Sequence, residues 1–188
     1  MAVRETHTSQ REYKSKTPPI SDLLNLLLKN RHPTGPINEV WPSVYIGNAS
    51  TARDKTLLLN LGITNILNAA DGPHRIDTGA NFYSDMAIQY YGVDAPDNCE
   101  FDLSPFFYPS AEFIQGALSQ KGKGISRSAT LVFAFLMISE KLTLVEAIKA
   151  VCKHRNVLPN AGFLNQLCHL EMTLSLGRER VDNCEVDL

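Results

Sequence analysis

Several features are scarce or missing in this chain of 188 residues, and each absence excludes a class of protein. No apolar run is long enough to cross a membrane, and residues 1–5 are too polar for a signal peptide. A net charge of −2 offers no basic surface to nucleic acid or to an anionic membrane. The four cysteines form no CxxC pair, which indicates free thiols in a reducing compartment. We therefore expect a cytoplasmic location, with the nucleus as an alternative.

Breakers and apolar residues divide the chain into four segments. Residues 1–19 are polar and end in prolines, so we expect a disordered N-terminal arm. Residues 20–37 begin with a leucine-rich helix, which Ser21-Asp22 can cap, and continue as a linker. Residues 38–175 form the domain, and residues 176–188 are a tail. The leucines lie on more than one helix face, so this helix must pack on its own domain or on a partner. If it packs on a partner, that partner can be a second copy of the chain, so the sequence leaves open whether the protein forms a homodimer.

Strands alternate with helices up to about residue 120, and only helices follow. Strands are expected near 40–41, 44–47, 63–69 and 88–93. Helices are expected over 51–61, where Gly62 ends the helix, over 129–139, and from 104 onward. Two more are expected from 143, with a capping box, and from 160, with Asn160 as the cap. The segment 129–139 is apolar nearly all round, as a central core helix is. This order predicts an α/β domain with a central, mostly parallel sheet flanked by helices.

A loop of small residues, Gly124-Ile125-Ser126-Arg127-Ser128, runs directly into this apolar helix. Backbone N–H groups in a tight loop, together with the positive end of a helix, attract a phosphate dianion. The guanidinium of Arg127 can hold two phosphate oxygens. Ser126 and Ser128 can also act as plain helix caps, which does not exclude phosphate binding. An incidental arginine is disfavoured here, because a cation at the start of a helix opposes the helix dipole.

Several motifs, in order along the chain, resemble those of small atypical dual-specificity protein phosphatases. They are Asn38-Glu39-Val40-Trp41-Pro42, Leu61-Gly62-Ile63-Thr64, Ala95-Pro96-Asp97, Gly124-Ile125-Ser126-Arg127-Ser128, Leu142-Thr143-Leu144-Val145-Glu146-Ala147 and Pro159-Asn160-Ala161-Gly162-Phe163-Leu164. The likeness covers about residues 20–174. It implies a cysteine-dependent phosphatase fold with phosphorylated proteins as substrates, kinases among the partners, and neither a metal nor an organic cofactor.

The resemblance also implies roles for individual residues. In the family a thiolate attacks phosphorus and forms a phosphocysteine. Asp97 would protonate the leaving oxygen and later deprotonate the attacking water, which suits a mobile loop. Gly124, Ile125, Ser126 and Arg127 would bind the phosphate, and Ser128 would hydrogen-bond the sulfur.

Without the resemblance, Asp97 is better explained as a turn residue, since Pro96-Asp97-Asn98 is good turn chemistry. Its nearest competitors for the acid role, Asp94 and Glu100, are expected to face solvent.

The family signature, His-Cys-x-x-Gly-x-Ser-Arg-Ser after an apolar strand, is only half present. The nucleophile position, six residues before Arg127, holds Lys121, and no other cysteine precedes an arginine at that spacing. We therefore expect that the central strand before the phosphate loop is deleted and that the chain as written is inactive. Either residues 120–124 stretch across the gap, or the preceding helix unravels to supply apolar residues to the sheet.

Three interpretations of this gap stay open. The chain is a spliced or mispredicted form of a phosphatase acting on phosphotyrosine and phosphoserine/threonine, or a pseudophosphatase that binds phosphorylated partners such as kinases, or a structural protein. The loss of one contiguous block favours the first, because pseudophosphatases usually keep the loop length and change the cysteine.

Overall fold

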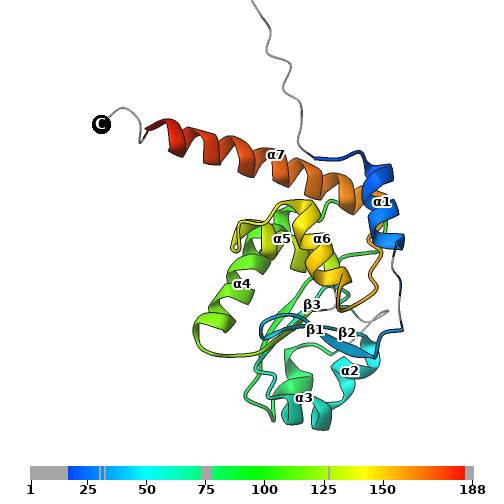
Figure 1. Ribbon diagram of the computed structural model, residues 1–188. Helices are drawn as coiled ribbons and strands as arrows, with labels where there is room; N and C mark the ends of the chain where they lie inside the picture. Colours follow the sequence, from blue (N-terminus) through cyan, green and yellow to red (C-terminus); the bar gives the residue numbers. More distant parts are fainter. Residues whose placement is uncertain (1–16, 30, 32, 73–77, 127, 185–188) are drawn as a thin grey trace, which may run out of the picture.

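The protein forms one sheet with helices on both faces, as a computed structural model that describes residues 17–29, 31, 33–72, 78–126 and 128–184 shows (Figure 1). The strands of the described residues are β1 (Ile37–Trp41), β2 (Val44–Gly47), β3 (Asn65–Asn68), β4 (Gln89–Gly92) and β5 (Gly124–Ser126). The α-helices are α1 (Ile20–Leu28), α2 (Ala49–Arg53), α3 (Lys55–Leu61), α4 (Phe107–Ser119), α5 (Ala129–Ile138), α6 (Leu144–Cys152) and α7 (Ala161–Cys184). Two short 3₁₀ helices are η1 (Ala80–Tyr83) and η2 (Ser104–Phe106). Among the described helices, none is both long and apolar enough to span a bilayer.

The strand order in the sheet is β1-β2-β5-β3-β4. Strands β2, β5, β3 and β4 run parallel, and only β1 pairs antiparallel, with β2. Helices α4, α5, α6 and α7 lie on one side of the sheet, and α2 and α3 lie on the other (Figure 1). This arrangement confirms the predicted α/β fold with a central, mostly parallel sheet.

The main core is centred on α5. Every residue of α5 from Thr130 to Met137 is buried, which confirms that the apolar segment is a central core helix. Helix α1 joins the same core, because Leu23 and Leu27 are 1% and 2% exposed and the helix contacts α6 and α7. The leucine-rich helix therefore packs on its own domain.

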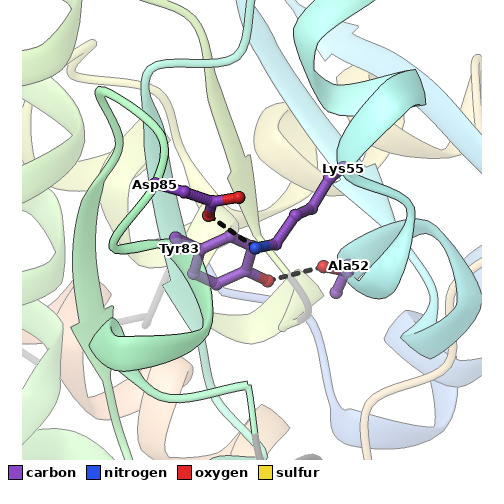
Figure 2. Close-up of polar contacts among 4 residues, drawn as sticks. All are labelled: Ala52, Lys55, Tyr83 and Asp85. Atoms are coloured by element: carbon purple, nitrogen blue, oxygen red, sulfur yellow. Dashed lines mark hydrogen bonds and ion pairs between the residues drawn. The ribbon is translucent and has the colours of Figure 1, made fainter.

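A smaller core on the opposite face holds α2 and α3 to the segment before β4. Leu58, Ile63, Ile66 and Tyr83 form this core. The Tyr83 hydroxyl donates a hydrogen bond of 2.6 Å to the carbonyl oxygen of Ala52, and Lys55 pairs with Asp85 beside it (Figure 2). The buried tyrosine bond fixes α2, whereas the exposed ion pair contributes little.

Several helix boundaries differ from the expectation. The helix expected over 51–61 is divided at Asp54, whose side chain accepts the N–H of Leu57 and so begins α3. Helix α1 begins at Ile20 after Pro19, without the expected cap from Ser21. Gly62 does end α3 in the left-handed conformation (φ 71°), and Thr143 does form a capping box at α6. Helix α7 continues to Cys184, past the expected domain end at residue 175.

The centre of the sheet differs most from the expectation. Helix α4 does not unravel: it ends at Ser119, and a turn with Lys121 at φ 58° reverses the chain. The carbonyl oxygen of Lys123 then accepts hydrogen bonds from the N–H groups of Thr64 and Asn65. Strand β5 follows immediately, so the central position is filled by Gly124–Ser126, three residues that were expected to form the loop beyond the strand.

Candidate functional site

A cleft of about 480 Å³ lies at the carboxyl ends of the parallel strands. Gly47 at the end of β2, Ala69 after β3, Ala95 after β4 and Ser128 before α5 all line it. In open α/β sheets, ligands bind outside this edge of the sheet. The fold therefore brings Asp97 and Ser128 to one cleft, although they are far apart in sequence.

Asp97 lies in the loop after β4, with its carboxylate exposed at the cleft. Its Oδ1 atom accepts a hydrogen bond of 2.9 Å from the side-chain amide of Asn160. The other end of that amide, Oδ1 of Asn160, accepts the N–H of Phe163 at 2.9 Å, which confirms Asn160 as the cap of α7. The cap was predicted from the sequence, but the contact to Asp97 was not, because the two residues are 63 positions apart.

The loop that carries Asp97 is held against α7 at two further points. Gln166 accepts the N–H of Leu103 and donates to the carbonyl oxygen of Phe101, both at 2.8 Å. Gly162 approaches the backbone of Cys99 so closely that a Cβ atom would lie 2.0 Å from the Cys99 carbonyl oxygen. The loop was expected to suit a mobile acid, but α7 ties it down along its length.

Most of the segment that was expected to bind phosphate forms a strand and a helix cap instead. Gly124, Ile125 and Ser126 form β5, so the prediction of a loop is wrong for these three residues. Ser128 caps α5 by accepting the N–H of Leu131 at 3.3 Å. Arg127 lies outside the described residues. The phosphate-binding roles of Gly124, Ile125, Ser126 and Arg127 stay predictions.

Arg155 is a cleft residue that the sequence analysis missed. Its guanidinium donates to the carbonyl oxygen of Gly35 at 3.0 Å and to Oδ1 of Asn38 at 2.8 Å. Partial burial lowers the pKa of Arg155, but a guanidinium remains protonated at neutral pH. It therefore places a positive charge in the wall of the cleft, which the start of α5 also lines. No local pattern distinguishes Arg155 from a surface arginine.

No thiol lines the cleft among the residues that the structure describes. Cys99 is exposed on the loop after Asp97, whereas burial raises the pKa values of Cys152 and Cys168 and so disfavours their thiolates. Within the same described part of the chain, no group of His, Cys, Asp and Glu is arranged to hold a metal ion. The site thus contains a carboxylate, a guanidinium and helix N–H groups, but no nucleophilic thiol among the residues that the structure describes.

Comparison with known proteins defines the class. The family model described as the catalytic domain of dual specificity phosphatases matches residues 44–173, and the chain belongs to this family. The family implies phosphoproteins as the class of substrate.

Two relatives carry the name dual specificity protein phosphatase 13B. The Homo sapiens protein is 54% identical over 151 residues, which cover 76% of this chain and 75% of the relative. The Mus musculus protein is 47% identical over 166 residues, which cover 84% of each.

Solved structures share the fold. A mouse putative dual specificity phosphatase complexed with zinc tungstate has a TM-score of 0.66 and 26% identity, and the match covers 79% of this chain and 94% of that one. The human tyrosine phosphatase-like serine/threonine/tyrosine-interacting protein has a TM-score of 0.64 and 28% identity, covering 73% and 96%.

Proposed function

We propose that this chain is a non-hydrolysing form of a dual-specificity phosphatase, whose intact form removes phosphate from phosphotyrosine and phosphoserine/threonine. The observation that carries the proposal is the connection between β5 and α5. The strand ends at Ser126 and Ser128 caps the helix, so a single residue joins them. Such a connection has no room for the Cys-x-x segment that carries the family's nucleophile.

The chemistry of the intact enzyme supports this interpretation of the residues that persist. A phosphocysteine forms when a thiolate attacks phosphorus and the bond to the leaving oxygen breaks. Asp97, at the cleft and held by Asn160, would donate the proton to that oxygen and later take one from water. Arg127 would hold the phosphoryl oxygens, and Ser128 would hydrogen-bond the departing sulfur. Every role but that of the nucleophile has a residue.

Hydrolysis of para-nitrophenyl phosphate tests the proposal directly. Because no thiol lies at the described cleft, the purified chain should turn over this substrate no faster than buffer does. The Arg127→Ala variant serves as the matched control and should give the same background. Turnover by the wild-type chain that this substitution abolishes would show an active phosphatase site and overturn the proposal.

A second function, binding of phosphorylated partners such as kinases, is favoured by the cleft itself. Its volume of about 480 Å³, the charge of Arg155 and the start of α5 are features that attract an anion without any nucleophile. We expect a phosphotyrosine peptide to bind saturably in a fluorescence titration, and its unphosphorylated counterpart not to bind. This function would be excluded if the two peptides bound equally well, or if the folded chain bound neither of them.

A further inference from the structure

Thr17 and Glu171 connect the chain entering α1 with two other helices. The hydroxyl of Thr17 donates a hydrogen bond to Oε2 of Glu171, which lies on α7. The other carboxylate oxygen of Glu171, Oε1, accepts the N–H of Leu144 at 2.8 Å, at the first residue of α6. One carboxylate therefore joins α6, α7 and the segment before α1.

The sequence around Thr17 is one that a class of protein kinases recognises. Thr17 is partly exposed, lies at a bend, and is followed by Pro18 and Pro19. Pro19 has φ −55° and ψ 152°, an extended polyproline backbone. A threonine followed directly by proline is what proline-directed Ser/Thr kinases select.

We propose that Thr17 is a phosphorylation site for a proline-directed Ser/Thr protein kinase, and that its phosphate releases α1 from α6 and α7. In the reaction, Oγ1 of Thr17 attacks the γ-phosphorus of ATP. The bond from that phosphorus to the β–γ bridging oxygen breaks, ADP leaves with the electron pair, and the hydroxyl proton passes to a base of the kinase. The Thr17 oxygen can then no longer donate to Glu171, and a phosphate of nearly two negative charges faces the carboxylate.

Two electrostatic effects on α1 oppose each other, and repulsion is the larger. The positive end of α1 attracts the phosphate, but it amounts to only about half an elementary charge. Glu171 carries a full negative charge and is in direct contact with the modified oxygen. A helix as short as α1, with nine residues, does not persist alone in water, so release also unfolds it. Release would expose Leu23 and Leu27 together with the surface they cover on α6 and α7.

Ser104 provides an internal comparison, because it too precedes a proline. It begins the 3₁₀ helix η2, and both its hydroxyl and its N–H bond to Oδ1 of Asp102, at 2.6 Å and 3.0 Å. This backbone is helical and is held by a side chain. The structure therefore assigns phosphorylation to Thr17 and not to Ser104.

The test treats the full chain with a proline-directed kinase and Mg·ATP, locates the phosphate by mass spectrometry, and measures amide hydrogen exchange. The informative amides are those of Asp22, Leu23 and Lys29, which hydrogen-bond within and around α1. We expect phosphate on Thr17, and exchange about tenfold faster or more at these amides. A tenfold shift needs only about 1.4 kcal/mol, which repulsion between close charges supplies.

The Glu171→Gln variant isolates the repulsion. A glutamine still accepts the N–H of Leu144, and its amide can donate to the phosphate, so phosphorylated E171Q should keep slow exchange in α1. Three results would overturn the proposal: no phosphate on Thr17, phosphorylated wild type with unchanged exchange, or equally fast exchange in phosphorylated E171Q. The Thr17→Ala variant, treated identically, shows whether any change requires this hydroxyl.

Discussion

At the scale of single residues, the position of Asp97 depends on α7. Asn160 holds the carboxylate and Gln166 holds the backbone of the loop. Gly162 permits the close approach between them, since any side chain there would meet the Cys99 backbone. The acid candidate is therefore positioned by three residues of one helix end, and the loop is not an independent element.

Replacing Gly162 with alanine should separate the Asp97 loop from α7. The new Cβ would lie 2.0 Å from the Cys99 carbonyl oxygen and 2.7 Å from its carbon, and backbone atoms yield less readily than side-chain ends. We expect a loss of roughly 1–3 kcal/mol in the free energy of unfolding, measured by urea denaturation.

Gly116→Ala is the matched control for this substitution. Gly116 lies within α4, and apart from the backbone of its own helix and its chain neighbours no atom comes within 4 Å of the added Cβ. The same change should raise stability there by roughly 0.5–1 kcal/mol, because glycine is the poorer helix former. If both substitutions changed the free energy of unfolding by the same amount, the close packing of the Asp97 loop on α7 would be contradicted.

At the scale of secondary-structure elements, the sequence predicted those helix ends that depend only on nearby residues. The left-handed Gly62, the capping box at Thr143 and the Asn160 cap all depend on neighbours within a few residues, and all three are confirmed. Asp54 also carried a local signal, as a capping residue before a helix-forming stretch, yet a single helix was predicted across it.

Strand β5 could not have been predicted from its own residues. Gly124–Ser126 contains one apolar residue and carries no strand signal. Its conformation is imposed from outside, because β2 and β3 would otherwise present unpaired N–H and C=O groups to each other. The chain between α4 and α5 therefore pairs with them, whatever residues it contains. The contacts of Asn160 and Arg155 also escaped prediction, because their partners lie far away in the sequence.

At the scale of the whole molecule, the sheet and the phosphate loop compete for the same residues. Gly124–Ser126 fills the central position between β2 and β3, so these residues are withdrawn from the edge where the cleft lies. The sheet is therefore continuous, but these residues no longer form a phosphate-binding loop. This competition explains how the family's α/β domain persists in a chain that carries only half of the signature.

Supplying a proper strand should return those residues to the loop. We expect that an apolar strand followed by His-Cys-x-x, inserted between Lys123 and Gly124, takes the place of β5. The free energy of unfolding should rise by about 1.5–3 kcal/mol for each large apolar side chain that becomes buried, and para-nitrophenyl phosphate should be hydrolysed. The same insertion with serine in place of the cysteine should show an equal gain in urea denaturation but no hydrolysis. A repaired chain that is stable yet inactive with cysteine would contradict the assignment of Asp97, Arg127 and Ser128 to phosphate chemistry.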